Sequence, residues 1–421
     1  MRVIVAIVGL MVSVGLAHPS FLGAPMTTPQ TPGTASLAQV PNPNYRGRNG
    51  PRALANIYRK HGVPFPRDLH TAIAKLDDKD NGTAALVPQY NDLEYLVPVF
   101  IGTPPQELHV DVDTGSSDFW VFSTELPKDQ INGQTVYDPA KSSSARKMSG
   151  ATWKISYGDG SSSSGDVYLD VAMVGNISFA AQAVEAAQQV SPEFSNDANS
   201  DGVFGFAFSS LNQVIPDPQL TFFDNMIPKL EKSVFTVDLR HLAPGFLNLG
   251  FIDPNAYSGS IAYTPVNGST GFWAIDSTGY TVGSGSFRKN NIVAIADTGA
   301  TLLLLPPDFV DEYYSHVGGS KYEADQGGMT FRCSAVVPDL KVHLLSNVIG
   351  DDAGGPSVTI PGDYIRYTKI YNMDGTESGR CYGGLQSNIG LGISILGDIF
   401  LKSAFVVFDA EQPRLGLAKK A

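Results

Sequence analysis

Two short segments of the chain carry the residue types that acid–base catalysis needs. An apolar run ends in Asp-Thr-Gly at residues 113–115, and a second apolar run ends in the same three residues at 297–299. One copy alone is an ordinary β-turn sequence. Two copies, each ending an apolar run and separated by about half the length of the body, indicate a duplicated lobe. Asp113 and Asp297 are therefore the candidate catalytic pair.

Two carboxyl groups held side by side can supply both an acid and a base. At a separation of about 3 Å they cannot both ionise, so they share one proton. One group can then take a proton from water while the other protonates or polarises a peptide carbonyl. Gly115 would let the backbone pack close to a carboxylate, and the hydroxyl groups of Thr114 and Thr298 can tie one loop to the other. This chemistry needs neither a metal ion nor a nucleophilic side chain.

The elements that would position this pair are mostly β-strands. From about residue 86 onward, short β-branched and aromatic runs alternate with Gly, Asn, Asp and Ser, for example at residues 93–102, 108–112 and 119–123. A helical apolar period is clearest at residues 307–317. With 421 residues, of which 43% are hydrophobic, the chain can build two or three lobes with a large core. We expect a mainly β protein with a few short helices.

The first residues predict export. Arg2 precedes an apolar run that ends in small residues at position 17, which is typical of a secretory signal peptide at residues 1–17; an uncleaved anchor is the alternative. No later run is long enough for a membrane helix. In an oxidising compartment Cys333 and Cys381 could form a disulfide, or remain two buried thiols. Sequons at Asn81, Asn176 and Asn267 are possible glycosylation sites.

The charge is divided unevenly along the chain. Residues 1–85 hold nine basic and four acidic residues, a net charge of +5, whereas the remaining 20 basic and 37 acidic residues give −17. A basic leader before an acidic body suggests a pro-segment at residues 18–85 that is held to the body by electrostatic attraction. It would contain a helix at residues 53–60. The alternative is an N-terminal tail that is only solvated. Acid would weaken this attraction and promote release. The acidic body also makes nucleic acid a poor partner.

The motifs together resemble those of the pepsin-like aspartic endopeptidases, most closely the secreted fungal branch of penicillopepsin-like and aspergillopepsin-like enzymes. The sequence at residues 119–122 follows the first motif as in that family, and residues 155–161 look like its active-site flap. Residues 201–205 and 395–400 look like the segments that brace the two catalytic loops. The resemblance runs from about Tyr95 to Ala418, nearly the whole body.

The resemblance implies a bilobal acid protease fold. Two β lobes related by a pseudo-twofold axis, residues 86–275 and 276–421, would enclose the cleft. The enzyme would be a self-activating zymogen and a monomer, with its own pro-segment and polypeptide substrates as partners and with no cofactor, metal ion or membrane contact after signal cleavage. It would cut between apolar residues at acid pH. Vacuolar retention is an alternative to secretion, and a catalytically silent binding or inhibitor protein is the contrasting class, which the intact motifs disfavour.

Family resemblance also gives roles to the residues of the two catalytic loops. Asp113 and Asp297 would activate the lytic water, and Ser116 would hydrogen-bond to the Asp113 carboxylate. Thr114, Gly115, Thr298 and Gly299 would support the two loops. The second motif departs from the family, because Ala300 stands where many members carry Thr or Ser. Asp297 would therefore lack the hydroxyl partner that Asp113 has. Because a donor favours the charged form of a carboxyl group, its absence should raise the pKa that Asp297 contributes to the titration of the pair.

Outside the catalytic loops the resemblance assigns the flap, a disulfide and an inhibitory lysine. Tyr157 would be the flap tyrosine, bonded to Trp120 and followed by Gly158; an ordinary solvated hairpin is the alternative. Asp159 and Ser161 would accept a Lys side chain beside the cut, unless they are only exposed turn residues. Cys333 and Cys381 would form the disulfide of the C-terminal lobe. Lys60 would pair with the catalytic carboxyls in the zymogen, or be a solvated charge.

Overall fold

The structure is a computed structural model, and it describes residues 33–40, 48–80, 96–156, 162–195, 200–241, 243–346, 355–372 and 374–421. The chain divides into two units, Met1–Thr31 and Pro32–Ala421, and every described residue belongs to the second unit. The predicted signal peptide at residues 1–17 lies outside the described residues. Within these residues the strands form four sheets, so the predicted mainly β fold is confirmed.

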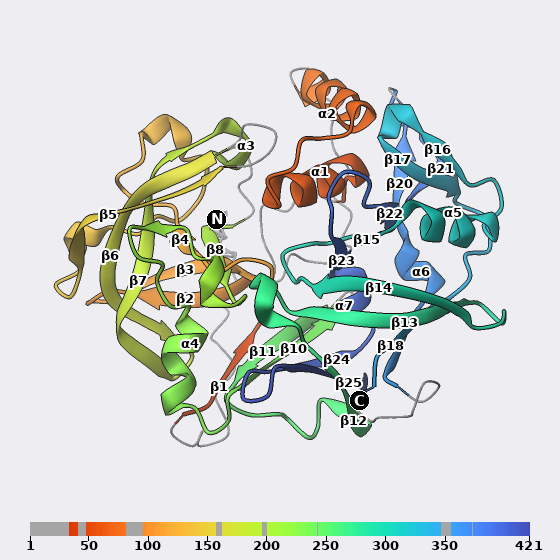
Figure 1. The fold of residues 1–421 in the computed structure, drawn as a ribbon. Coiled ribbons are helices and arrows are strands. Elements are labelled where there is room, and N and C mark those ends of the chain that lie inside the picture. Colours follow the sequence, from red (N-terminus) through yellow and green to blue (C-terminus); the bar gives the residue numbers. More distant parts are fainter. Residues whose placement is uncertain are drawn as a thin grey trace, which may run out of the picture. The chain divides into compact units, whose positions relative to one another are not determined.

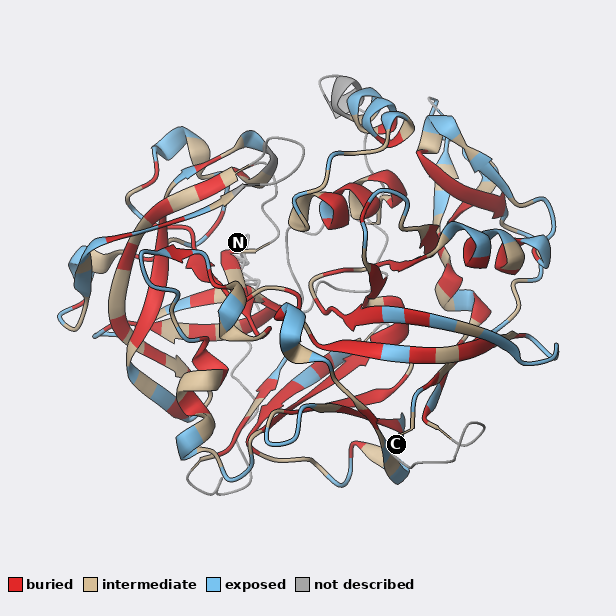
Figure 2. Cartoon of the chain, in the orientation of Figure 1, coloured by how far each residue is buried: buried red, intermediate tan, exposed pale blue. Residues whose placement is uncertain are grey.

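The first half of the body folds around an eight-stranded sheet, which we call the N-terminal lobe. Its strands, in spatial order, are β2 (Leu96–Ile101), β3 (Gln106–Asp113), β8 (Gly202–Gly205), β4 (Phe119–Val121), β7 (Ile177–Val190), β6 (Ser162–Val174), β5 (Arg146–Ser156) and β9 (Val214–Ile215). Short helices α3 (Pro192–Ser195) and α4 (Phe222–Met226) accompany it. Buried and less buried residues alternate along β6, so one face of this long strand packs on the core (Figure 2).

The second half folds around two sheets, which form the C-terminal lobe. The seven-stranded sheet has the order β19 (Ser357–Ile360), β18 (Leu340–Leu344), β13 (Ala274–Val282), β14 (Arg288–Ala296), β23 (Ser394–Leu396), β15 (Leu303–Leu305) and β22 (Leu385–Ser387). The four-stranded sheet has the order β16 (Lys321–Glu323), β17 (Gly328–Arg332), β21 (Glu377–Gly383) and β20 (Arg366–Tyr371). Helices α5 (Pro307–Ser315), α6 (Gly362–Ile365) and α7 (Asp398–Leu401) complete it, and α5 begins at the proline of the predicted helical period.

A disulfide closes the four-stranded sheet. Cys333 directly follows β17 and Cys381 lies in its partner β21, and their sulfur atoms are bonded. The predicted disulfide is therefore confirmed, and the alternative of two unlinked thiols is wrong.

A six-stranded sheet joins the two lobes. Its order is β1 (Ala35–Ala38), β11 (Ala243–Leu249), β10 (Val234–Arg240), β24 (Phe405–Asp409), β25 (Arg414–Lys420) and β12 (Tyr257–Pro265), so strands from both halves of the body pair directly. On one face the rings of Phe235 and Phe408 stack with centroids 4.4 Å apart, and Trp273 meets Phe408 edge-on at 5.2 Å. The indole N–H of Trp273 also donates to the carbonyl of Phe206 in the N-terminal lobe, at 2.8 Å. Apolar burial and this bond fix one lobe against the other.

The two lobes repeat one strand arrangement, which is the structural form of the predicted duplication. In the N-terminal lobe β3 pairs in parallel with β8, β8 pairs antiparallel with β4, and β4 pairs in parallel with β7. In the C-terminal lobe β14, β23, β15 and β22 pair in the same three ways. Each Asp-Thr-Gly segment leaves the first strand of its set, so the repeat brings two equivalent loops to the junction between the lobes.

Two helices that precede the body lie between the lobes, as Figure 1 shows for α1 (Gly50–Lys60) and α2 (Arg67–Asp80). Asn49 caps α1 by accepting from the N–H of Arg52, and Pro51 stands in its first turn. The helix buries Leu54, Ile57 and Tyr58 along one side. Among the described residues, no helix has the length and apolar character needed to cross a membrane.

Candidate active site

The two candidate catalytic aspartates lie at the ends of equivalent strands and are buried together. Asp113 is the last residue of β3, and Asp297 directly follows β14; their exposed fractions are 4% and 0%. A Cβ atom placed on Gly115 would come within 2.5 Å of the Asp297 carboxyl carbon, and one on Gly299 would come within 2.6 Å of Asp113 Oδ1. Each glycine therefore packs against the carboxylate of the opposite lobe, where any side chain would collide.

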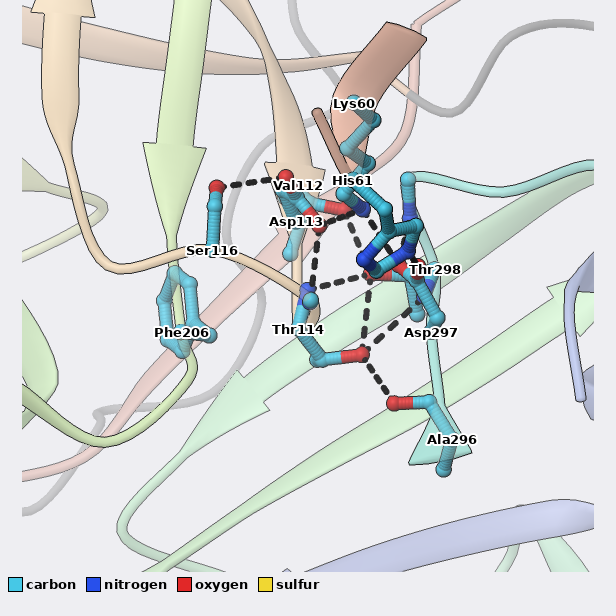
Figure 3. Close-up of polar contacts among 12 residues, drawn as sticks. Lys60, His61, Val112, Asp113, Thr114, Ser116, Phe206, Ala296, Asp297 and Thr298 are labelled. Carbon is cyan, nitrogen blue, oxygen red and sulfur yellow. Dashed lines mark hydrogen bonds and ion pairs between the residues drawn. The ribbon is translucent and has the colours of Figure 1, made fainter. Parts of the chain in front are cut away.

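Thr114 and Thr298 tie the two catalytic loops to each other by four reciprocal hydrogen bonds (Figure 3). The Thr114 hydroxyl donates to the carbonyl of Ala296 at 2.8 Å and accepts from the N–H of Thr298 at 3.0 Å. The Thr298 hydroxyl donates to the carbonyl of Val112 at 2.5 Å and accepts from the N–H of Thr114 at 3.0 Å. Because each hydroxyl belongs to one lobe and its partners to the other, the network fixes the relative position of the two carboxyl groups.

The donors to the two carboxylates differ. In each carboxylate Oδ1, which we call the inner oxygen, accepts a hydrogen bond from a glycine N–H of its own loop, and Oδ2 is the outer oxygen. The N–H of Gly115 donates to Asp113 at 2.8 Å, and the N–H of Gly299 donates to Asp297 at 3.0 Å. The outer oxygen of Asp113 also accepts from the Ser116 hydroxyl at 2.5 Å. The outer oxygen of Asp297 accepts no hydrogen bond from the described residues. Ala300, which is buried, stands in the place equivalent to Ser116.

Lys60, at the end of α1, reaches both carboxylates. Its Nζ atom lies 2.5 Å from Asp113 Oδ1 and 2.5 Å from Asp297 Oδ1, with 15% of its side chain exposed. The next residue, His61, places Nε2 3.6 Å from Asp297 Oδ2 and packs its ring 5.9 Å from that of Phe272. The distance of 3.6 Å is an ion-pair contact, too long for a hydrogen bond. Two basic side chains of one segment therefore face the two acidic groups.

These contacts shift the three pKa values in different directions. Burial alone would lower the pKa of Lys60, but the two carboxylates outweigh it and hold that pKa above its usual value. Burial raises the pKa of Asp113 and the charge of Asp297 adds to the rise, against the opposing effects of Lys60 and Ser116. Burial would also raise the pKa of Asp297, but Lys60 and His61 outweigh it and hold that pKa below its ordinary value. While Lys60 and His61 are in place, Asp113 is therefore favoured in its protonated form and Asp297 in its charged form.

Not all predicted site residues fall in the described part of the chain. Tyr157, Gly158, Asp159 and Ser161 lie outside the described residues, so the flap and its bond to Trp120 stay predictions. Trp120 itself is described, and it is buried on β4. Its ring stacks on Trp153 with centroids 5.9 Å apart and meets Phe194 edge-on at 5.6 Å. An aromatic cluster therefore surrounds Trp120 on β4, two strands from β3 in the sheet.

Sequence reasoning missed two contributors to the site. His61 follows Lys60 directly, and an imidazole next to the candidate lysine was the available signal. The bond from Trp273 to Phe206 had no such signal, because its partners are far apart in the sequence and one of them is a backbone carbonyl.

Comparisons with known proteins agree with this geometry. Residues 94–420 match the family model of the eukaryotic aspartyl proteases. The chain is 49% identical to endothiapepsin of Cryphonectria parasitica over 395 residues, which cover 92% of this chain and 91% of that protein. It is 45% identical to aspergillopepsin-1 of Aspergillus oryzae over 405 residues (96% and 97% of the two chains). It is also 45% identical to penicillopepsin-3 of Penicillium janthinellum over 401 residues (95% and 96%).

The missing donor at Asp297 gives a testable consequence. We predict that Ala300→Thr moves the pH of maximal peptide hydrolysis to a more acidic value, because a hydroxyl donor favours the charged form of the carboxyl group. The measurement is kcat/KM against pH for acid-activated protein. Ala300→Val, which has the shape of threonine without the hydroxyl, is the matched control and should leave the profile in place. Superimposable profiles for the threonine and valine variants would refute the prediction.

Proposed function

Because the chain belongs to the eukaryotic aspartyl protease family and is an aspartic endopeptidase, we propose that it is a secreted zymogen whose mature body cuts internal peptide bonds at acid pH. The observation that carries the proposal is the position of Lys60, 2.5 Å from one oxygen of each catalytic carboxylate. A cation at this point neutralises the base that must activate water. Residues 18–85 would then be the pro-segment, and hydrolysis would begin when Lys60 leaves.

In the released body the two carboxyl groups would share the chemical work. Once Lys60 withdraws, a water molecule between Asp113 and Asp297 can give its proton to the charged carboxylate and attack the peptide carbonyl. The protonated partner donates to the carbonyl oxygen, and a proton then reaches the leaving nitrogen. The N–H groups of Gly115 and Gly299 hold the inner oxygens during both steps. No covalent intermediate is formed in this scheme.

Further contacts of the leader support its assignment as a pro-segment. The hydroxyl of Tyr58 on α1 donates to the carbonyl of Ile389 at 2.6 Å. A Cβ atom on Gly50 would collide with the ring of Tyr382 at 2.2 Å, so α1 lies directly on that ring. Arg48, before α1, donates to the backbone carbonyl of Tyr367 at 2.8 Å. Its guanidinium carbon also lies 5.1 Å from the centre of the Tyr367 ring. Together these contacts attach α1 and Arg48 to the C-terminal lobe.

The second helix and the first strand also attach the leader to the body. Lys75 on α2 forms an ion pair with Asp325, and a Cβ atom on Gly327 would lie 2.6 Å from the Cα atom of Leu69 on α2. Strand β1 pairs antiparallel with β11 at the edge of the six-stranded sheet. The ion pair of Lys75 is exposed and contributes little to stability. Apolar packing and backbone pairing therefore hold these parts, whereas charge holds α1 at its catalytic end.

Acid is the expected trigger for release. The pKa of Asp297 is held low by Lys60 and His61, so this carboxyl stabilises the bound leader at pH values above its ordinary titration range. That stabilisation is lost as the pH falls through the lowered pKa. Protonation of other body carboxylates weakens, at the same time, the general attraction between the −17 body and the pro-segment at 18–85, whose eight basic and four acidic residues give +4.

Several finer assignments belong to the same proposal. The signal peptide would be residues 1–17, and the two lobes would be residues 86–275 and 276–421, a boundary that falls two residues after the start of β13. Strand β12 of the first lobe pairs with β25 of the second. Apolar residues would flank the cut, with Lys also accepted before it through Asp159 and Ser161. Asn176 and Asn267 are both exposed, which supports glycosylation at these two positions. The mature protein would act as an extracellular or, alternatively, vacuolar monomer.

The proposed activity predicts the behaviour of one carboxyl-to-amide substitution. At acid pH the wild-type precursor should shorten to the mature mass and cleave an unfolded protein substrate, and a mimic of the tetrahedral diol should block the cleavage. Asp297→Asn removes one half of the acid–base pair, so it should lower kcat by at least about 1000-fold. Asp276→Asn, at an exposed position of β13, is the control and should retain activity. A fully active Asp297→Asn protein would exclude this mechanism.

The inhibitory contact predicts a change in the pH of activation. Lys60→Met removes the cation from the catalytic centre, so self-processing of the precursor should begin at a pH about one unit higher than in the wild type. Lys60→Arg keeps the charge and should stay close to the wild type. Intact mass measured after incubation across a pH series gives both onsets. If the methionine variant and the wild type are processed at the same pH, Lys60 is not the inhibitory group.

A further inference from the structure

A second pair of carboxyl groups lies behind the first catalytic loop. Asp118 directly precedes β4, and Glu185 lies on β7, where it pairs with Trp120 of β4. Their exposed fractions are 3% and 1%. Neither residue touches substrate in the mechanism above, and two buried acidic groups without a purpose would be a costly feature of the fold. Their contacts indicate what the pair does.

Asp118 and Glu185 both accept hydrogen bonds from uncharged donors. The amide nitrogen of Asn212 donates to Asp118 Oδ1 at 3.0 Å and to Glu185 Oε1 at 2.9 Å. The N–H of Gln213 also donates to Asp118 Oδ1, at 2.7 Å. Glu185 Oε2 accepts no hydrogen bond from any described residue. Two charged carboxylates would leave this oxygen without a donor, whereas one protonated carboxyl can donate to its neighbour.

Asn212 also connects the buried pair to the turn that carries Ser116, which hydrogen-bonds to Asp113. The Asn212 amide also approaches the carbonyl of Ser117 at 3.3 Å, and the Ser117 hydroxyl donates to the carbonyl of Phe208 at 2.7 Å. Ser116, the preceding residue, donates to Asp113. The turn at residues 116–118 is thus fastened on one side to Asn212 and the buried pair, and on the other it presents the hydroxyl that Asp113 accepts.

We propose that Asp118 and Glu185 hold one proton between them and thereby position the turn that presents Ser116 to Asp113, so that loss of this proton at rising pH dismantles the catalytic loop. The two residues are positioning residues for hydrolysis. The proposal concerns the folded state of the loop and does not depend on secretion, the zymogen or substrate preference.

The electrostatics agree with shared protonation. Burial raises the pKa of Asp118 to about 6, against hydrogen bonds from Gln213 and Glu185, and the charge of Asp113 adds to the rise. Burial and the charge of Asp118 raise the pKa of Glu185 well above its usual value. Because both shifts are upward, the stabilisation is complete at acid pH and is lost as the pH rises from about 4 through about 6.

Within the described part of the chain, the elements packed against the pair bring no cation to it. Strands β4 and β8 and residues 184–187 of β7 carry no charged side chain other than Glu185 itself, and Asn212 and Gln213 are neutral. On β6, Val167 lies opposite Glu185. Its neighbour Asp166 forms an ion pair with Lys147 on β5. Among the described residues, Asp113 is the charged group outside the pair that raises the pKa of Asp118, and it thereby disfavours full ionisation of the pair.

The test is Glu185→Gln in the full chain. The glutamine amide reproduces the protonated carboxyl, because it can accept from Asn212 and donate to Asp118 at every pH. We expect the pH midpoint of unfolding, followed by near-ultraviolet circular dichroism from about pH 4 to about pH 8, to rise by about one unit. The upper limb of the kcat profile should move with it, while kcat/KM in acid stays within about twofold. Glu107→Gln, at a half-exposed glutamate of β3, should shift neither.

A second variant makes the outcome unambiguous. Asp118→Asn also places an amide donor between the two groups, so it should shift both midpoints in the same direction. Unshifted midpoints in both variants would overturn the proposal. Failure of Glu185→Gln to fold at acid pH would overturn it as well, because the amide supplies the same hydrogen bonds that the shared proton supplies there.

Discussion

The structure depends on one constraint, that two carboxylates of like charge must be held close together in a buried place. Isolated charges are expensive to bury, and two of the same sign are worse. The chain meets this requirement by repetition, because the same strand arrangement brings one loop from each lobe to the junction. The crossed hydrogen bonds of Thr114 and Thr298 then lock the loops together, and Gly115 and Gly299 leave room for the opposite carboxylate.

Negative charge is compensated in different ways at the catalytic pair, at the second carboxyl pair and over the chain as a whole. Around Asp113 and Asp297, Lys60 and His61 of the leader supply the positive charge. Near Asp118 and Glu185 the described residues place no cation, and in our proposal a shared proton takes its place. Across the whole chain, a basic leader faces an acidic body. Under the two proposals above, acid would both free the catalytic pair and preserve the loop that holds it.

Much of this could be predicted from the sequence, because the decisive signals are local. The repeated Asp-Thr-Gly motif identified both aspartates, and alternating β-branched runs indicated strands such as β3 and β4. The family resemblance pointed to Lys60, but only tertiary packing brings His61 to Asp297. Nothing in the sequence singles out Asp118, because its partner Glu185 lies on another strand and its donor Asn212 on another loop. Such burial depends on the assembled sheet and leaves no mark in a short segment.

The most direct test of this account is a double-mutant cycle between Thr114→Val and Thr298→Val, with kcat of the acid-activated protein as the readout. If the two hydroxyl groups form one lock between the lobes, removing either breaks it. The double variant should then be little worse than the poorer single variant, with an interaction energy of about 1 kcal/mol or more. Thr114→Ser and Thr298→Ser keep the hydroxyl groups and should stay active. Effects that add to within about 0.5 kcal/mol would contradict the account.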